Sequence, residues 1–258
     1  MNEPFQMDSL ENLVRKARAR LRAFIPADGR PYYLCDSGGK DSCVIRRLAQ
    51  MEGVPFVSHY NVTTIDPPEL VRFIRRFHAD TRFERAPMPF HEMIIKKQIL
   101  PTVGKRWCCS IYKERKLEPG NVKILGVRAE ESKARADRAQ YTKSHLGSLE
   151  ISIILEWKSS DVWEFIRSEN IPYCELYDQG FERIGCVGCP LAGRRMRLLV
   201  FQRWPKFKVQ ILQSLRKIHS SKSEFQTVED WFEWWMLERR ETLYPVGCGE
   251  FFKPFDQS

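Results

Sequence analysis

The sequence predicts an α/β protein with a parallel sheet and a helical C-terminal extension. Three observations predict this class. A short apolar run, residues 32–35, leads directly into a glycine-containing loop, a helical repeat follows that loop, and a second apolar run covers residues 54–60. This strand–loop–helix–strand order indicates parallel strands joined by helices. After Pro190 the chain becomes basic and rich in tryptophan, and the spacing of its apolar residues is helical.

The first expected element is an amphipathic helix within residues 1–25. Asp8 and Ser9 suit the N-cap, because their side chains accept hydrogen bonds from the first helical turn. Apolar side chains then recur at helical spacing, at Leu10, Leu13, Val14, Ala17, Leu21 and Phe24. Pro26 and Gly29 end the pattern, so we expect this helix to precede the main domain.

The main domain is expected over residues 26–193. Its first strand covers residues 32–35, and the helix after the loop continues to Ala49. The elements that follow are a strand over 54–60, a helix from Asp66-Pro67-Pro68, a helix over 89–100, strands over 122–127 and 151–155, and a helix from Ser159 or Ser160.

Residues 194–258 are expected to form a basic, tryptophan-rich helical extension. A long basic helical region covers residues 194–219 and is broken near Pro205, and a second covers residues 228–243. The second region carries Trp231, Phe232, Trp234 and Trp235. We expect these aromatic side chains to pack on the core, and base stacking or partner binding is the alternative.

Composition restricts the classes of protein and partner. The 258 residues are 43% hydrophobic, enough for a core, and the formal net charge of +9 favours anionic partners such as nucleotides, sulfate or nucleic acid. No apolar run reaches the roughly 20 residues that span a bilayer, so no membrane partner is expected. Eight cysteines without a visible secretion signal indicate a reducing, cytoplasmic location, where clustered cysteines bind metals more often than they form disulfides.

The glycine loop, Ser37-Gly38-Gly39-Lys40-Asp41-Ser42, is the clearest binding motif. A glycine turn between a strand and a helix presents backbone N–H groups and the positive end of the helix dipole to a phosphate. Lys40 adds a charge, and the Ser37 and Ser42 hydroxyls add donors. The spacing differs from the Walker motif. It is similar instead to the Ser-Gly-Gly-x-Asp-Ser loop of ATP pyrophosphatases. The alternative is a capped turn without a ligand.

Four cysteines form a candidate metal centre: Cys108, Cys109, Cys186 and Cys189. The Cys-x-x-Cys pair puts two thiolates on one side of a turn. The adjacent pair binds separate irons of a cluster more readily than one tetrahedral ion, which favours a 4Fe–4S cluster. Zinc in a four-cysteine site and buried free thiols are the alternatives. Cys35, Cys43 and Cys174 lie in apolar surroundings and are expected in the core.

From residue 32 to residue 193 the chain resembles the phosphoadenosine-phosphosulfate reductase family. The resemblance rests on the Cys-Cys pair with Lys113 and Lys116, on Gly126-Val127-Arg128-Ala129-Glu130-Glu131-Ser132, on Trp157-Lys158-Ser159-Ser160-Asp161-Val162-Trp163 and on the stretch from Leu176 to Cys186. It implies a Rossmann-like, adenine nucleotide α-hydrolase-like fold, with the four cysteines as cluster ligands. Within it, Arg128 is expected to bind phosphate or sulfate through its planar fork, with an ion pair to Glu130 or Glu131 as the alternative.

Two features differ from the reductases of that family. Those reductases carry a C-terminal Glu-Cys-Gly-(Leu or Ile)-His motif, whereas Cys248 here lies in Gly-Cys-Gly-Glu. Their phosphate loop is usually modified, whereas this chain keeps the complete pyrophosphatase form. The complete form occurs in relatives that use ATP to activate a sulfur acceptor, as in DNA phosphorothioation and tRNA thiolation.

Three functions therefore compete. The first is an ATP pyrophosphatase with a 4Fe–4S cluster that activates an acceptor, such as nucleic acid, for sulfur insertion. A cysteine desulfurase or another donor would supply the sulfur. Lys40, Asp41 and Arg128 would be its catalytic residues, and Asp41 the Mg²⁺ ligand. The second is a sulfite-forming reductase of adenylyl sulfate or phosphoadenylyl sulfate with Cys248 as nucleophile, and the third is a non-enzymatic nucleotide- or nucleic-acid-binding module.

Overall fold

The computed structural model describes residues 9–114, 117–118, 120–144, 146–220 and 223–237. The chain divides into two compact units. The first, the sheet unit, takes Met1–Val62, Asp66–Ala86 and Tyr112–Gly185, and the second, the helical unit, takes Thr63–Ile65, Pro87–Ile111 and Cys186–Ser258. The predicted boundaries at residues 25 and 193 stay a prediction.

The sheet unit contains a six-stranded sheet in the order β3-β2-β1-β4-β6-β5. Its strands are β1 (Tyr32–Cys35), β2 (Phe56–Asn61), β3 (Arg82–Glu84), β4 (Val122–Leu125), β5 (Tyr141–Lys143) and β6 (Leu149–Ser152). All neighbouring strands pair in parallel except β5 and β6, which are antiparallel. This confirms the predicted α/β class with a mainly parallel sheet.

Two strands were not expected, and one was misplaced. The edge strands β3 and β5 have three residues each, and charged side chains interrupt any apolar run in them. The strand expected over residues 151–155 lies at Leu149–Ser152. The apolar run continues beyond the end of this strand with Ile153, Ile154 and Leu155. These side chains are buried in the core, although their backbone is not part of the sheet.

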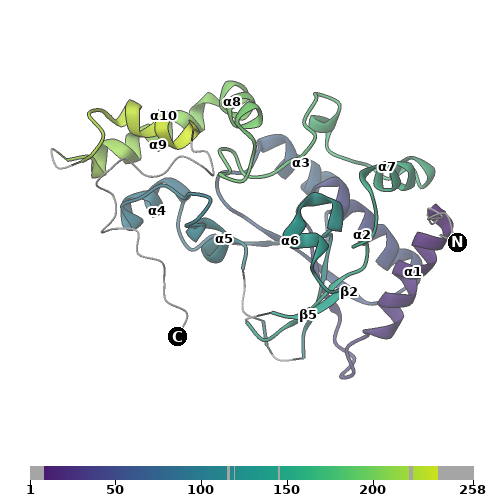
Figure 1. Ribbon diagram of the computed structural model, residues 1–258. Coiled ribbons are helices and arrows are strands. Elements are labelled where there is room, and N and C mark those ends of the chain that lie inside the picture. Colours follow the sequence, from purple (N-terminus) through teal and green to yellow (C-terminus); the bar gives the residue numbers. More distant parts are fainter. Residues whose placement is uncertain (1–8, 115–116, 119, 145, 221–222, 238–258) are drawn as a thin grey trace, which may run out of the picture. The chain divides into compact units, whose positions relative to one another are not determined.

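Helices α1 (Leu10–Ala23), α2 (Lys40–Glu52) and α7 (Ser159–Ser168) pack together in the sheet unit. Helices α3 (Pro68–Phe77) and α6 (Lys133–Ala136) and the 3-10 turns η1 (Ala129–Glu131) and η2 (Glu175–Tyr177) complete it (Figure 1). The expected cap of α1 is confirmed, since the Ser9 hydroxyl accepts from the Asn12 N–H at 3.3 Å.

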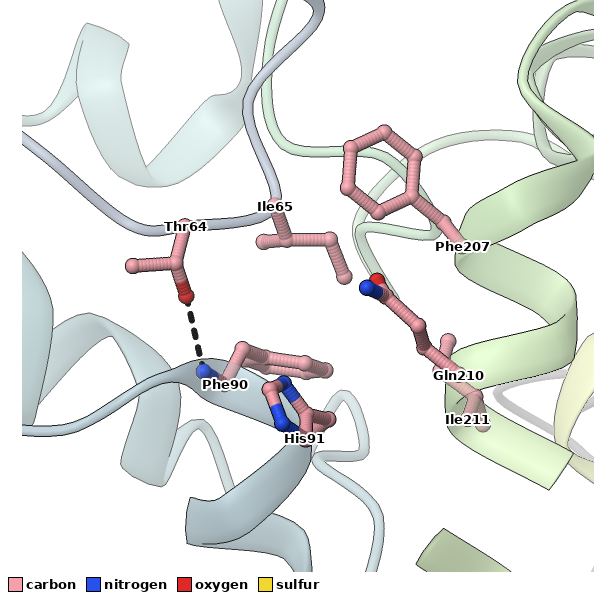
Figure 2. A pocket seen from close by; sticks show the side chains of 7 residues that line it. All are labelled: Thr64, Ile65, Phe90, His91, Phe207, Gln210 and Ile211. Carbon is pink, nitrogen blue, oxygen red and sulfur yellow. Dashed lines mark hydrogen bonds between the residues drawn. The ribbon is translucent and has the colours of Figure 1, made fainter. Parts of the chain in front are cut away.

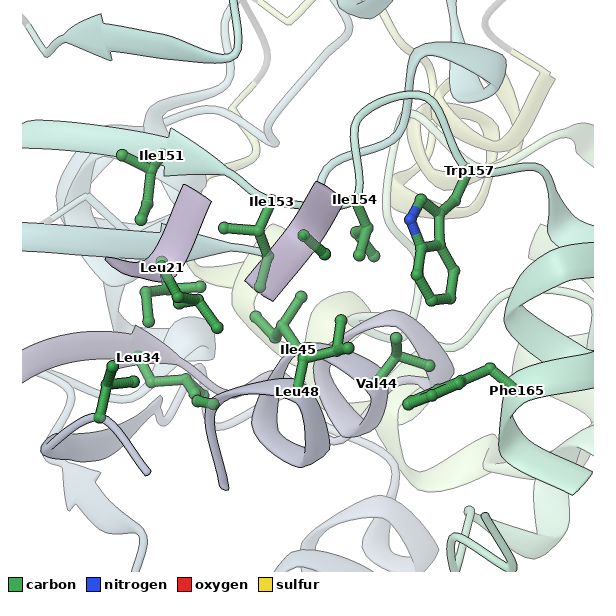
Figure 3. Packing of buried hydrophobic residues seen from close by; sticks show 14 of the residues in the cluster. Leu21, Leu34, Val44, Ile45, Leu48, Ile151, Ile153, Ile154, Trp157 and Phe165 are labelled. Carbon is green, nitrogen blue, oxygen red and sulfur yellow. The ribbon is translucent and has the colours of Figure 1, made fainter. Parts of the chain in front are cut away.

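The core of the sheet unit lies between α1, α2, α7 and the central strands (Figure 3). Figure 3 shows Leu21 of α1, Ile45 and Leu48 of α2, and Trp157 and Phe165 near α7 among the buried side chains. A hydrogen bond joins helix and sheet at one point, where the Tyr32 hydroxyl donates to the Leu21 carbonyl at 2.6 Å. The N-terminal helix is therefore part of this core.

Three arginines on the basic, exposed side of α1 form ion pairs. Arg18 and Arg22 both pair with Glu52, at 2.7 and 2.6 Å, and Arg20 pairs with Glu156 at 2.6 Å.

The helical unit contains α4 (Phe90–Lys97), the first five residues of α5 (Trp107–Tyr112), α8 (Arg194–Arg203), α9 (Pro205–Ile218) and α10 (Val228–Leu237). Trp204 separates α8 from α9 immediately before Pro205, which confirms the expected break. Phe207, Ile211 and Leu215 form the buried side of α9. Figure 2 shows a small hollow beside Phe207, between α9, Phe90 and Ile65.

The aromatic residues of α10 are only partly buried in the helical unit. Trp235 is fully buried, and its indole N–H donates to the Pro101 carbonyl at 2.7 Å, while Phe232 is buried beside it. Trp231 and Trp234 are half-buried against Phe225. Among the described residues no helix is long and apolar enough to cross a membrane.

Replacing Leu21 by alanine should destabilise the protein by about 2–5 kcal/mol, because it leaves a cavity between α1 and the sheet. Ile25 lies just beyond the same helix and is 47% exposed. Ile25→Ala should therefore change stability by less than about 0.5 kcal/mol. Urea unfolding followed by circular dichroism measures both. Equal midpoints for the two variants would show that α1 is not part of the core.

Candidate functional site

The glycine loop lies at the centre of the sheet. It follows β1, which has β2 on one side and β4 on the other, and it leads directly into α2. The chain passes from β1 through α2 to β2, so the loop lies at the carboxyl end of the strand where the strand order reverses. Open α/β sheets bind ligands at this point.

Two glycines permit the tight packing around the loop. Gly38 has φ +68°, and a Cβ there would lie 2.7 Å from side-chain carbons of Leu70 and Ile74 in α3. Gly126 follows β4, and a Cβ there would lie 3.1 Å from the Asp41 carbonyl carbon. A side chain at either position would push the first turn of α2 away from its neighbours.

Asp36, the residue before the loop, is a buried acceptor for four donors. Its Oδ1 accepts from the Gly38 N–H at 2.9 Å. Its Oδ2 accepts from His78 Nδ1 at 2.6 Å, Thr81 Oγ1 at 3.1 Å and Ser58 Oγ at 3.4 Å. Burial alone would raise the pKa of Asp36, but these hydrogen bonds, the one from His78 above all, hold it below its ordinary value. An ionised Asp36 therefore fixes the loop to β2 and to the end of α3.

Lys40 is enclosed by residues from the last sequence segment of the sheet unit. Its backbone N–H donates to the Tyr177 hydroxyl at 2.9 Å, and its ammonium lies 5.5 Å from the centre of the Tyr177 ring. The ammonium also lies 3.5 Å from the Glu182 carbonyl oxygen and 3.8 Å from an Asp41 carboxylate oxygen. Burial raises the pKa of Tyr177, so its hydroxyl stays protonated.

The two serines close the loop on itself. The Ser42 hydroxyl donates to the Gly39 carbonyl at 2.8 Å, and the Ser37 oxygen accepts from the Gly39 N–H at 3.4 Å. The two hydroxyl oxygens are 3.4 Å apart. Ser37 is exposed, whereas Ser42 is buried, so the two hydroxyls are not equivalent as donors to a ligand.

Arg128 lies beside the loop and is 4% exposed. Its Nε donates to Asp41 Oδ1 at 2.6 Å, and one of its terminal nitrogens pairs with Glu130. Burial would lower the pKa of Arg128, but the charge of Asp41 and the hydrogen bonds with Glu130 and Asp41 raise it instead. The guanidinium is thus a fixed buried cation between the loop and η1.

The structure brings the predicted loop residues Ser37 to Ser42 and Arg128 together, and it adds two that the sequence did not indicate. Asp36 could have been suspected from its position, an acid directly between a buried strand and the glycine loop. Tyr177 lies in the family stretch from Leu176 to Cys186, but nothing in the sequence ties it to Lys40, which is 137 residues away along the chain.

The four cysteines all belong to the helical unit. Cys108 and Cys109 lie in the first turn of the short helix α5, and a tight turn, Cys189 N–H to Cys186 carbonyl at 3.2 Å, joins the other two. A backbone hydrogen bond of 2.8 Å from Val187 to Ile65 holds this turn, and Gly188 packs against Phe201 and Trp235. All four thiols are partly exposed.

The donor set suits an iron–sulfur cluster. The pKa of the Cys108 thiol is raised by its hydrogen bond with Cys109, by burial and by the charges of Cys109, Cys186 and Cys189, so the four sulfurs are near enough to interact. In the part of the chain that the structure describes, no group of three or more His, Cys, Asp or Glu converges on one metal ion. A cluster does not require this, because each thiolate binds a different iron.

The residue before Cys108 carries a buried donor. The indole nitrogen of Trp107 is buried and has no hydrogen-bond partner among the described residues. Donors of this kind stabilise thiolate and sulfide charge in iron–sulfur proteins.

The other cysteines differ. Burial raises the pKa of Cys35 to about 12 and also raises the pKa values of Cys43 and Cys174. These three are unreactive thiols of the sheet unit. Cys248 lies outside the described residues.

The fold is a mainly parallel α/β sheet with a glycine loop at its switch point. The model of the phosphoadenosine phosphosulfate reductase domain matches residues 31–192, well over half of the chain. The chain belongs to this family.

Individual relatives agree with the family. The chain is 30% identical over 213 residues to the uncharacterized protein MJ0973 of Methanocaldococcus jannaschii, which covers 77% of this chain and 52% of that protein. It is 28% identical over 180 residues to an adenosine 5′-phosphosulfate reductase of Allochromatium vinosum. That match covers 60% of this chain and 66% of the reductase. The chain thus spans about half to two thirds of the length of these curated relatives.

A solved structure shows the same fold. The phosphoadenylyl-sulfate reductase of Candida auris, in a phosphate complex, has a TM-score of 0.50 and 17% identity over 72% of this chain and 98% of that one. At this identity the likeness concerns the fold alone, which is the adenine nucleotide α-hydrolase-like fold expected from the sequence.

Asp36→Asn should destabilise the protein by about 1–3 kcal/mol at neutral pH, because an amide cannot accept from all four donors. The folded-state pKa of Asp36 lies below its ordinary value of 3.8. Its contribution is therefore complete above that value and is lost as the pH falls through the folded-state pKa. Chemical unfolding at pH 7 and at acid pH should show the gap between wild type and variant closing in acid.

The matched control is Asp137→Asn, since Asp137 is exposed at the end of α6. It should follow the wild type at every pH. A gap between Asp36→Asn and wild type that is the same at pH 7 and in acid would contradict the role given to the Asp36 carboxylate.

Proposed function

We propose that the protein is an ATP pyrophosphatase that activates an acceptor for sulfur insertion and carries a 4Fe–4S cluster. The observation that carries this proposal is the complete Ser37–Ser42 loop at the switch point of the sheet, with the buried guanidinium of Arg128 beside it. A loop of this kind suits a chain of phosphates, and a fixed buried cation suits the charge that develops when one of them is displaced.

In this mechanism the loop binds the phosphates of ATP through its backbone N–H groups and the N-terminus of α2. An oxygen of the acceptor attacks the α-phosphorus and forms a new P–O bond. The bond between the α-phosphorus and the bridging oxygen to the β-phosphate breaks, and its electrons leave with pyrophosphate. Sulfur from a donor such as a cysteine desulfurase, with a thiol reductant that supplies two electrons, then forms a bond to the activated atom of the acceptor. The bond from that atom to the AMP oxygen breaks, and its electrons leave with AMP.

Three side chains would supply most of the rate by positioning and charge. Tyr177 holds the backbone of Lys40, and Lys40 presents its ammonium to the phosphates. Arg128 exchanges its bond with Asp41 for one with a phosphate oxygen, which releases the Asp41 carboxylate to bind Mg²⁺. This exchange keeps every buried charge compensated.

The cluster would be held by Cys108, Cys109, Cys186 and Cys189. When bound, it would supply an iron site for sulfur. The chain's own contribution would be the pair of turns that present the thiols, with the buried, unpartnered N–H of Trp107 as a candidate donor to their negative charge.

The second candidate is reduction of a sulfonucleotide to sulfite. It is supported by the names of the relatives, several of which are adenosine 5′-phosphosulfate reductases. It requires Cys248 as the nucleophile, in a sequence context that differs from theirs. Binding of nucleotide without turnover would indicate the third candidate, a non-enzymatic module.

Anaerobically purified protein should release pyrophosphate from ATP in the presence of Mg²⁺, a sulfur donor and bulk nucleic acid. Arg128→Lys keeps the charge but loses the fork, and kcat should fall by about 10²–10³-fold. Malachite-green detection after pyrophosphatase treatment measures the release. Sulfite formed from adenosine 5′-phosphosulfate, with no pyrophosphate from ATP, would select the reductase.

Arg138→Lys is the control for that experiment. Arg138 pairs with Glu150 on β6 and with no described residue of the loop, so its replacement by lysine should leave kcat within about twofold of the wild type. A melting temperature for each variant separates lost chemistry from lost folding. Equal losses in the two variants would contradict a role for Arg128 at the phosphates.

Cys109→Ala should abolish the brown colour of the anaerobically isolated protein and reduce its iron content from about four atoms per chain. Cys174→Ala should keep both, because Cys174 is a buried free thiol of the sheet unit. Metal analysis and the visible spectrum are the measurements. A metal content of about one zinc per chain, with no iron, would show that the four cysteines bind zinc and not a cluster.

A further inference from the structure

The positive charge of the chain is concentrated in the helical unit. Residues 186–220 contain eight lysines and arginines and no aspartate or glutamate, a formal charge of +8 against +9 for the whole chain. The rest of the chain is therefore close to neutral. A concentration of one sign on two consecutive helices, α8 and α9, is the charge pattern of a surface for anions.

Most of these cations are exposed and unpaired, in contrast to those of α1. Arg197 is buried over the Trp235 ring, and Arg216 pairs with Glu229 at 2.9 Å. Five others are exposed and form no ion pair with any residue that the structure describes: Arg194, Arg195, Lys206, Lys208 and Lys217. On α1, by comparison, Arg18, Arg20 and Arg22 each form an ion pair with Glu52 or Glu156.

The exposed side of α9 carries an ordered polar stripe, which we define as Lys206, Gln210, Gln213 and Lys217. All four are exposed, and their spacing of i, i+4, i+7 and i+11 places them on one side of the helix. The apolar residues Phe207 and Ile211 face the interior of the unit, and Figure 2 shows Gln210 beside them at the rim of the hollow.

The length of the polar stripe favours an extended anion over a small one. Eleven residues separate its two lysines, a rise of about 16 Å along the helix. Successive phosphates of one strand of DNA advance by about 3.4 Å along its axis, so the stripe matches a run of several phosphates. Glutamine side chains between the lysines suit the sugar and phosphate oxygens of such a chain.

An anionic membrane fits this surface less well. Binding in the membrane interface requires a broad apolar face beside the basic one. The apolar face of α9 is buried inside the helical unit, and the large hydrophobic side chains exposed on α8 and α9 within the described residues are Leu198 and Val209.

We propose that the polar stripe, together with Arg194 and Arg195, binds the phosphate backbone of a nucleic acid. This rests on the proposed function and names the class of its acceptor. The cations carry affinity and position the strand, while the sequence or base is selected elsewhere.

The test uses the full chain, purified anaerobically, and two fluorescein-labelled probes, a DNA duplex of two helical turns and an RNA hairpin. Fluorescence anisotropy should show binding of at least one probe. Lys206→Gln combined with Lys217→Gln should weaken that binding about tenfold at about 0.1 M salt and reduce the slope of log K against log salt by about 1–2. Circular dichroism and iron content confirm that the double variant is folded.

The matched control is Arg75→Gln combined with Arg76→Gln, which removes the same charge from exposed positions at the end of α3. It should bind both probes as the wild type does. Equal weakening in the two double variants overturns the proposal, because only net charge would then matter. Wild-type protein that binds phosphatidylserine vesicles and neither probe also overturns it.

Pyrophosphate release from ATP is measured in parallel, so the two proposals fail separately. If pyrophosphate is released but nucleic-acid binding does not depend on the polar stripe, the proposal for this surface is overturned and the proposed ATP chemistry is not. Stripe-dependent binding without release supports the surface and counts against the pyrophosphatase.

Discussion

The glycine loop depends on one buried carboxylate. Asp36 lies at the end of the central strand and accepts hydrogen bonds from Gly38, Ser58, His78 and Thr81. A carboxylate offers about four lone-pair sites, so these four donors saturate it. Each donor comes from a different part of the sheet unit, namely the loop, β2, the end of α3 and the turn before β3. The carboxylate therefore sets both the shape of the loop and its position against α3, where Gly38 has no room for a side chain.

A second buried charge is compensated next to the first. Arg128 is nearly inaccessible, and its guanidinium is shared between Asp41 of α2 and Glu130 of η1. An uncompensated buried charge costs several kcal/mol, so these acids are required for the arginine to lie there. If an anion takes the place of Asp41, the buried guanidinium of Arg128 still has a negative partner. Gly126 makes this geometry possible, because it lets the segment that carries Arg128 approach the first turn of α2.

The sequence predicts the fold best where one apolar run or one repeat decides an element. The strand before the loop, α2, the second strand and α1 with its Ser9 cap are of this kind. It fails at β3, β5 and α5, which have only three to six residues and no run long enough to show a period. Within the candidate site, Ser37 to Ser42 follow from a local motif, and Arg128 from a family segment. Tyr177 also lies in a family segment, but its role does not follow from the sequence, because its contact with Lys40 joins residues 137 positions apart.

The distribution of ion pairs explains why net charge alone says little about partners. The sequence shows two basic helical faces, one on α1 and one on α8 and α9, and they are equivalent by composition. In the fold, Glu52 and Glu156 form ion pairs with three arginines of the first, since they lie on or near elements that pack against α1. The second has no acidic residue within its own stretch of chain to perform that role. A cation that already has a carboxylate contributes little to binding an anion, because the carboxylate must first be displaced and hydrated again. The exposed lysines of α9 carry no such cost, so the available positive potential belongs to the helical unit.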